Sequence, residues 1–198
     1  KWYESASEQN HANAQYSLGL IYYNETSPFK DLEKAAKYFE KAAIKGLVLS
    51  QYQLGMFYYV GEIYQQDFKQ AKSWLEKSAS QGYKEAQFHL GMLYLNKFKN
   101  FKKAKDYLIK AAGQDHIEAQ FNLGSMYYNG HGLKKSDSNA FKCYLKAADP
   151  KNDGSGKGGL QEAQYNLALL YSKRNNTKQY LNWLKKAAEQ GHLKAQYD

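Results

Sequence analysis

The sequence has one cysteine and no long apolar run, and both absences exclude classes of protein. Cys143 is the only cysteine among 198 residues, so a small scaffold held together by intramolecular disulfides is excluded. No stretch approaches the roughly 20 apolar residues of a membrane-spanning helix, and no charged-then-apolar secretory signal opens the chain. We therefore expect no transmembrane segment. The chain begins at Lys1 rather than Met, and we favour a bacterial periplasmic or secreted location, with any signal sequence absent from this chain.

Arginine is almost absent although the chain is basic. Lys and Arg total 28 against 19 Asp and Glu, a formal net charge of +9, yet Arg174 is the one arginine. Nucleic-acid-binding proteins use arginine for bidentate contacts to phosphate and guanine, whereas lysine on helix exteriors mainly promotes solubility. The densest basic run, KFKNFKK at residues 97–103, fits a solvated turn between helices better than a site for acidic partners or lipid head groups. Specific nucleic-acid binding is not expected.

The sequence is dominated by one phrase that recurs along the chain. It reads AQYSLG, AQFHLG, AQFNLG and AQYNLA in its clearest copies. A protein usually has one catalytic site, built from residues of different types. A recurring phrase therefore indicates a repeated structural surface rather than an active site. Spacings of 36, 36, 33, 44 and 32 residues separate the copies and indicate a solenoid of helix pairs. The copies begin at Ala14, Ser50, Ala86, Ala119, Ala163 and Ala195.

A second phrase recurs along the chain with nearly the same spacing as the first and marks the second helix of each pair. It begins at Tyr38, Trp74, Tyr107, Cys143 and Trp183, as in YFEKAA and WLEKSA. The one long spacing comes from an insertion at 149–159, DPKNDGSGKGG, which is rich in helix breakers and flexible residues. The chain is thus predicted to be a single solenoid domain. Its units are about 11–46, 47–82, 83–115, 116–159 and 160–191, with partial units at 1–10 and 192–198.

Each first phrase reads as a helix with one packed face. Gln15, Leu18 and Tyr22 form a stripe at helical spacing. Beside them lies Gly19, which costs a helix about 1 kcal/mol, so its return in later units suggests close approach of a neighbouring helix. Helices are expected to end in a left-handed residue at Gly46, Gly82 and Gly191, with Asp115 in the glycine's place once.

Together the two phrases resemble the SEL-1-like repeat, a relative of the tetratricopeptide repeat. The clearest unit, residues 119–148, has Leu123, Gly124 and Tyr127 in place, followed by Gly130 and Gly132 in the turn. Ile63 in the second unit and Cys143 in the fourth depart from the pattern. The resemblance covers nearly the whole chain. It implies an all-α, α/α right-handed superhelical solenoid of about five antiparallel helix-pair repeats plus partial repeats at both ends, in a family of adaptors that bring other proteins together.

A second stripe on each first helix is rotated away from the packed one. By similarity to tetratricopeptide arrays it points into a concave groove, and a groove of Tyr, Phe and Met suits a bound peptide or helix. The alternative is packing between adjacent first helices, and for the column beginning at Tyr16 both interpretations stay open. The predicted partner-binding residues are Tyr16, Leu20, Tyr23, Tyr52, Met56, Tyr59, Phe88, Met92, Leu95, Phe121, Ser125, Tyr128, Tyr165 and Leu169.

No catalytic, cofactor or metal site is expected. His11, His116 and His192 recur at the turn between units, and His89 and His131 have no carboxylate or cysteine at metal-ligand spacing. The GSGKGG run lacks the spacing of a phosphate-binding loop and follows a helix rather than a strand, which favours a linker.

The sequence therefore predicts a non-enzymatic adaptor or scaffold that binds a protein or peptide in its groove. An immunity or inhibitor protein that wraps a toxin or effector enzyme is the alternative within the binding class. A more distant alternative is an enzyme such as a penicillin-binding hydrolase, because a cysteine-rich branch of the resembled family has been linked to penicillin binding. Each unit of that branch is closed by a disulfide, which the single Cys143 does not allow here. The sequence makes no prediction of oligomeric state.

Overall fold

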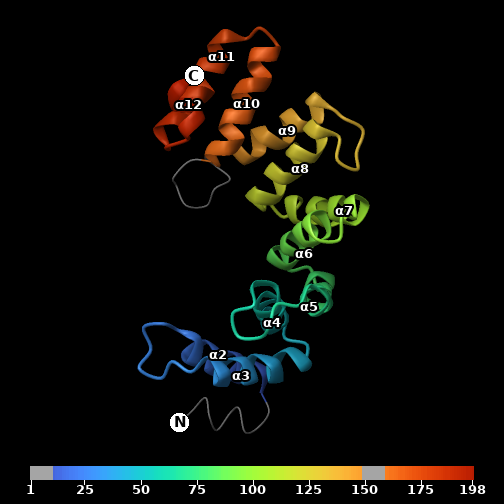
Figure 1. The fold of residues 1–198 in the computed structure, drawn as a ribbon, viewed down its shortest axis with the longest axis vertical. Coiled ribbons are helices and arrows are strands. Elements are labelled where there is room, and N and C mark those ends of the chain that lie inside the picture. The colour runs from blue at the N-terminus through green and yellow to red at the C-terminus, as the bar shows by residue number, and fades with distance from the viewer. Residues whose placement is uncertain (1–10, 149–158) are drawn as a thin grey trace. The chain divides into compact units, whose positions relative to one another are not determined.

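The computed structural model describes residues 11–148 and 159–198, which form eleven helices and no strand (Figure 1). The predicted all-α fold is confirmed. The predictions for residues 1–10 and for the insertion up to residue 158 lie outside the described residues. The helices are α2 (Ala12–Tyr23), α3 (Leu32–Ile44), α4 (Val48–Val60), α5 (Phe68–Ser80), α6 (Lys84–Asn96), α7 (Phe101–Ala112), α8 (Ile117–Asn129), α9 (Asp137–Ala148), α10 (Gln161–Lys173), α11 (Thr177–Glu189) and α12 (Leu193–Tyr197).

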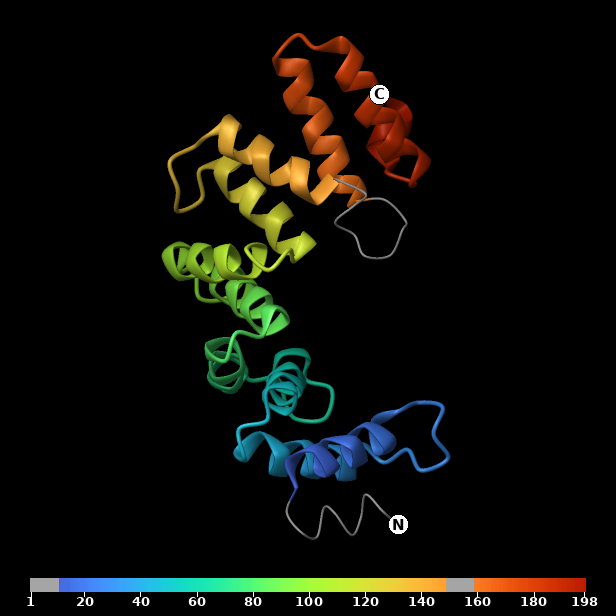
Figure 2. The same ribbon diagram turned by 180° about the vertical axis from the view of Figure 1, so that it is seen from behind.

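The helices pack in consecutive pairs within two compact units, residues 1–93 and 94–198. In the first unit α2 packs on α3, α3 on α4 and α4 on α5. In the second, each helix from α7 to α12 packs on the next. Figures 1 and 2 show α2 beside α3, α4 beside α5, α8 beside α9 and α10 beside α11 from opposite directions. None of the described helices is long and apolar enough to cross a membrane.

The second helices begin at side chains that accept hydrogen bonds from the first turn. Asp31 Oδ1 accepts from the backbone N–H of Lys34 at 3.0 Å, and Asn100 Oδ1 accepts from that of Lys103 at 3.0 Å. Each acceptor satisfies one of the N–H groups that a helix leaves unpaired at its start. The sequence therefore fixes these helix starts with local polar residues.

The predicted left-handed helix ends are confirmed. Gly46, Gly82 and Gly191 have φ of +89°, +91° and +93°, and Asp115 has φ of +57°. The same region holds Lys99 at φ +51° and Asn175 at φ +56°. These two residues lie in the turns of the third and fifth units, which lack the paired glycines. A non-glycine residue therefore takes the left-handed position there, at a steric cost that glycine avoids.

Glycines in the first helices allow close contact with the second helices, as predicted. A Cβ placed on Gly19 would lie 2.7 Å from the Phe39 ring. One on Gly124 would lie 2.7 Å from the ring of Tyr144. Real Cβ atoms do not approach other carbons this closely, so a side chain at these positions would push the helices of a pair apart.

The core of each pair lies between its two helices. Gln15 and Leu18 are 2% and 5% exposed, and Tyr22 stacks on Tyr38 of α3 with ring centroids 5.7 Å apart. This stripe therefore faces the partner helix, as the spacing predicts. Phe39 is fully buried and lies 5.8 Å from the ring of Phe57 on α4, which joins one pair to the next.

Candidate partner-binding surface

All fourteen predicted partner-binding residues lie on first helices, and the rings of Tyr16, Tyr23 and Phe121 also contact the second helix of their pair. All are half-buried except Leu20, which is 42% exposed. Partial burial suits a preformed binding surface and also suits packing between first helices, so their binding role stays a prediction. In the first compact unit they lie on α2 (Tyr16, Leu20, Tyr23), α4 (Tyr52, Met56, Tyr59) and α6 (Phe88, Met92). In the second they lie on α6 (Leu95), α8 (Phe121, Ser125, Tyr128) and α10 (Tyr165, Leu169).

The stripe on α2 is anchored by the buried core beneath it. The rings of Tyr16 and Tyr23 lie 5.6 Å and 6.3 Å from Phe39, and Tyr23 lies 5.6 Å from Phe57. The Tyr23 hydroxyl donates to the Glu62 carboxylate, 3.0 Å from Oε2. These contacts hold the rings in place, so a partner that uses them would not have to order them first.

The stripe on α4 meets α6 through an aromatic cluster, defined here as Tyr52, Tyr59, Tyr83, Phe88 and His89. Tyr52 lies 5.1 Å from Tyr83 and 5.8 Å from His89, edge-on or tilted. His89 also lies 6.3 Å from Tyr59 and 5.1 Å from Phe88. His89 therefore connects the rings of α4 with a ring of α6.

The hydroxyls of Tyr16, Tyr23 and Tyr52 stay protonated at neutral pH, because the pKa of each is raised. Burial raises the pKa of Tyr52 to about 12, with smaller contributions from Tyr83 and Glu85. Burial also raises the pKa of Tyr16. For Tyr23, burial and then the hydrogen bond to Glu62 raise the pKa. Each protonated hydroxyl can both donate and accept a hydrogen bond, so the surface offers polar contacts as well as apolar area.

In the second compact unit, α8 carries a shorter version of the stripe. The Phe121 ring lies 5.8 Å from that of Tyr144 on α9, whose hydroxyl hydrogen-bonds Ser125 Oγ at 3.2 Å. Tyr128 is flanked by cations: the Nζ of Lys173 is 4.4 Å and that of Lys135 5.7 Å from its ring centroid. Lys173 also pairs with the Asp137 carboxylate at 3.3 Å, so Tyr128 lies beside both Lys135 and an ion pair.

A hollow of about 530 Å³ brings two of the predicted residues together in the second unit. Phe121 and Tyr165 both line it, along with His192. The Tyr165 ring stacks on the His192 ring at 4.4 Å, and its hydroxyl donates to Asp198 Oδ2 at 3.0 Å. The hollow mixes ring faces with polar groups, which is the composition of a site for a peptide segment.

Sequence spacing did not place His89 or Tyr83 on this surface. His89 lies three residues after Ala86, a position filled by Ser17, Gln53, Asn122 and Asn166 in the other units. This column of polar residues next to the aromatic stripe could have indicated from the sequence that His89 lies beside the stripe. The contact between Tyr83 and Tyr52 joins residues from adjacent units, which spacing within one unit does not reveal.

The histidines at the turns have structural roles. The Nδ1 atoms of His116 and His192 accept hydrogen bonds from the backbone N–H groups of Ala119 and Ala195, at 3.3 Å and 3.2 Å. Both histidines therefore cap the start of a first helix. Within residues 11–148 and 159–198, no group of three His, Cys, Asp or Glu side chains could hold a metal ion.

Paired helices repeat every 32–36 residues, apart from the 44-residue spacing that contains the insertion, and a glycine of the first helix lies against a large side chain of the second. These features define a tetratricopeptide-like helical repeat protein. The model of the Sel1 repeat family matches residues 1–11, 12–47, 48–83, 84–116, 117–149 and 161–192. The chain belongs to the Sel1 repeat family.

Solved structures share the fold over most of the chain. The protective antigen c5321 of uropathogenic Escherichia coli, which displays the same repeat fold, is 30% identical with a TM-score of 0.86, over 98% of this chain and 42% of its own. The chain thus spans less than half the length of that relative. A Sel1 repeat protein of Oxalobacter formigenes is 25% identical with a TM-score of 0.79, over 94% of this chain and 76% of its own.

A more distant structure has the same fold at lower identity. YrrB, described as a tetratricopeptide repeat protein with an unusual peptide-binding site, is 22% identical with a TM-score of 0.62, over 100% of this chain and 97% of its own. Among curated proteins, none matches the chain. Repeats of this family generally mediate protein–protein interactions, and no enzyme family is evident from the comparisons.

Proposed function

We propose that this protein is a non-enzymatic adaptor that binds a protein or peptide along the aromatic stripe of its first helices. The observation that carries the proposal is the aromatic cluster of Tyr52, Tyr59, Tyr83, Phe88 and His89, whose rings lie 5.1–6.3 Å apart and stay half-exposed. Aromatic rings usually lie in the core of a protein. A connected set of rings that is half-exposed at the surface is therefore suited to contact with another molecule.

The chemistry of the stripe supports a polypeptide partner. Tyrosine rings offer large contact area with few rotatable bonds, and their hydroxyls can bond the carbonyl and amide groups of a peptide. Met56 and Met92 adapt to irregular side chains. The peptide-binding site described for YrrB, which has the same fold, adds support from a distant relative. A bacterial periplasmic or secreted location stays a prediction.

Removing three side chains of the stripe tests the proposal. We expect the Tyr59→Ala, Met92→Ala and Tyr128→Ala triple variant to bind its partner at least about 100-fold more weakly. The loss of two central contacts, each worth about 2 kcal/mol of binding free energy, is enough to produce that change. The measurement is affinity capture from a lysate of the source organism, followed by titration of the captured protein.

The matched control removes three exposed side chains of the second helices: Ile44→Ala, Leu145→Ala and Leu181→Ala, at positions 71%, 39% and 55% exposed. The control should bind like the wild type. Equal binding by both triple variants and the wild type would refute the groove assignment. If the captured partner is an enzyme that the chain inhibits, the inhibitor alternative replaces the adaptor.

A further inference from the structure

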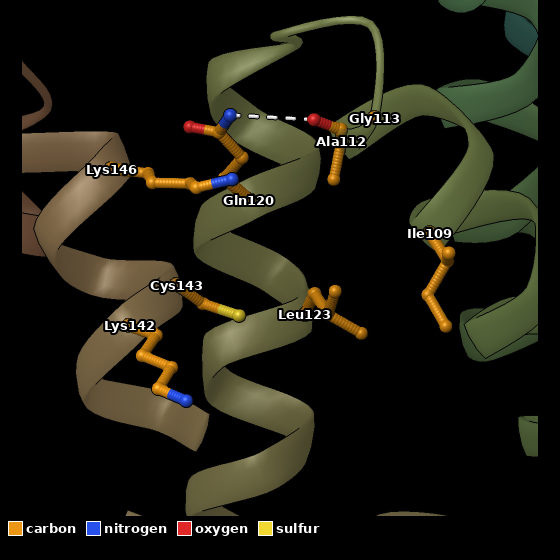
Figure 3. Close-up of a pocket in the computed structure, with 8 residues that line it drawn as sticks. All are labelled: Ile109, Ala112, Gly113, Gln120, Leu123, Lys142, Cys143 and Lys146. Carbon is orange, nitrogen blue, oxygen red and sulfur yellow. Dashed lines mark hydrogen bonds between the residues drawn. The ribbon is translucent and has the colours of Figure 1, made fainter. Parts of the chain in front are cut away.

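A second hollow lies in the second compact unit, away from the aromatic stripe. It measures about 250 Å³ and opens between α7, α8 and α9 (Figure 3). Ile109 and Ala112 of α7, Leu123 of α8 and Cys143 of α9 give it a mainly apolar lining. Leu123 belongs to the stripe of α8 that faces α9, so this hollow is distinct from the surface proposed above.

The hollow occurs in the one unit whose second phrase begins without an aromatic ring. In the other four units a ring stands at that position, and a lysine three residues later lies over it. In the fourth unit the pair is Cys143 and Lys146. The distances from lysine Nζ to ring centroid are 5.5 Å for Lys41 and Tyr38, 3.8 Å for Lys77 and Trp74, 5.3 Å for Lys110 and Tyr107, and 4.3 Å for Lys186 and Trp183.

The two equivalent tryptophans show where the absent ring would pack. Trp74 packs against a cluster that contains Ala43 and Leu54. Trp183 belongs to a cluster that contains Ala148 and Leu167. The residues at the same repeat positions in the unit of Cys143 are Ala112 and Leu123, and both line the hollow. The hollow therefore lies where an indole packs in two other units.

Among the described residues, Gln120 Oε1 also lacks the hydrogen-bond partner that two of its equivalents have. In two other units the equivalent glutamine accepts a side-chain hydrogen bond: Gln51 from Gln81 at 2.8 Å, and Gln164 from Gln190 at 3.0 Å. Gln120 lines the hollow, is 2% exposed, and its Oε1 has no partner in the described part of the chain.

The sequence also differs at the position of that donor. The donating glutamine stands seven residues after the aromatic position, and the residue seven after Cys143 is Pro150, which has no side-chain donor. Figure 3 shows the Gln120 amide at one end of the hollow, with Nε2 donating to the carbonyl oxygen of Ala112 and Oε1 on the side of α9. A buried acceptor without a donor is costly, so a ligand that supplies an N–H would gain from the contact.

The charges around the hollow have one sign. Lys142 and Lys146 line it, and no carboxylate is among its described lining residues. Burial raises the pKa of the Cys143 thiol, although Lys146 opposes the shift. The thiol therefore stays uncharged at neutral pH and acts as a small apolar side chain, which favours an apolar group inside the hollow and an acidic one at its rim.

We propose that this hollow receives the tryptophan side chain of an acidic segment in a partner polypeptide. The indole supplies the ring that Cys143 lacks and carries an N–H group from which Gln120 can accept a hydrogen bond. At the equivalent Trp183 the glutamine is already bonded by Gln190, and the indole Nε1 has no partner in the described part of the chain. Acidic residues beside the tryptophan pair with Lys142 at the rim of the hollow. The fourth unit thus carries a docking site on the α7–α9 side, independent of the stripe formed by Phe121, Ser125 and Tyr128.

The test uses synthetic peptides and variants that fill or preserve the hollow. The probe is Ac-Glu-Glu-Trp-Glu-Glu-NH2, with an analogue that has alanine in place of tryptophan, titrated by NMR. We expect the tryptophan peptide to bind the wild type and Cys143→Ala alike, and Cys143→Trp at least about tenfold more weakly. The Tyr59, Met92 and Tyr128 triple variant should bind this peptide like the wild type.

A second readout locates the peptide without any substitution. Because Cys143 is the only cysteine, alkylation by iodoacetamide reports on the hollow alone, and the bound peptide should slow it. If Cys143→Trp fails to fold, Cys143→Phe and this protection measurement decide. Equal binding of the alanine analogue, undiminished binding to the filled variants, or no binding of the tryptophan peptide would overturn the proposal.

Discussion

Replacing Phe39 by alanine is expected to lower the free energy of unfolding by about 3–5 kcal/mol, the cost of removing a buried aromatic side chain. Phe39 is fully buried, and its ring contacts those of Tyr16, Tyr23 and Phe57. It also fills the space that Gly19 leaves on α2. The substitution therefore opens a cavity at the point where two helix pairs and the aromatic stripe meet.

Urea denaturation followed by circular dichroism measures this effect. The control is Ile44→Ala on the same helix, at a side chain that is 71% exposed, and it should change stability by less than about 0.5 kcal/mol. A loss below about 1 kcal/mol for Phe39→Ala would show that the ring is not packed as described.

Replacing Leu90 by alanine should cost about 2–5 kcal/mol, the range for a large-to-small change in a core. Leu90 is fully buried on α6, at the position of the leucine in the repeated phrase. In a repeat array each unit depends on its neighbours for burial, so a loss within one unit weakens the array around it.

Thermal unfolding of Leu90→Ala checks this expectation against Leu181→Ala, where the leucine is 55% exposed on α11. The Leu181 variant should unfold close to the wild-type temperature. Unchanged unfolding of Leu90→Ala would mean that this leucine is not a core residue.

The sequence predicts the helices well because the determinants are local and repeat. Gly19 and Gly124 leave room for Phe39 and Tyr144, and the left-handed residues at Gly46 and Asp115 end helices where the spacing places them. Each unit carries the same signals, so the copies reinforce one another. The left-handed conformations of Lys99 and Asn175 were not predicted, because no glycine marks those turns.

The candidate site could be predicted only in part. Helical spacing placed Tyr52 and Tyr59 on one stripe, and they share it. Their contacts with His89 depend on how α6 packs beside α4, which a pattern within one helix does not contain. The hollow at Cys143 has the same origin: its volume depends on three helices from two repeats. The sequence showed that Cys143 stands where the other units have an aromatic ring. The packing of the neighbouring helices determines the size and lining of the hollow that results.

Site-specific photo-crosslinking tests the central claim most directly, because it records which surface touches a partner in the intact array. A benzophenone amino acid would replace Tyr59 in one variant and the exposed Ile44 in another, and both would be irradiated in lysate of the source organism. The account predicts a crosslinked polypeptide from position 59 and none from position 44. A crosslink from position 44 with none from position 59 would contradict it and place the binding surface on the second helices.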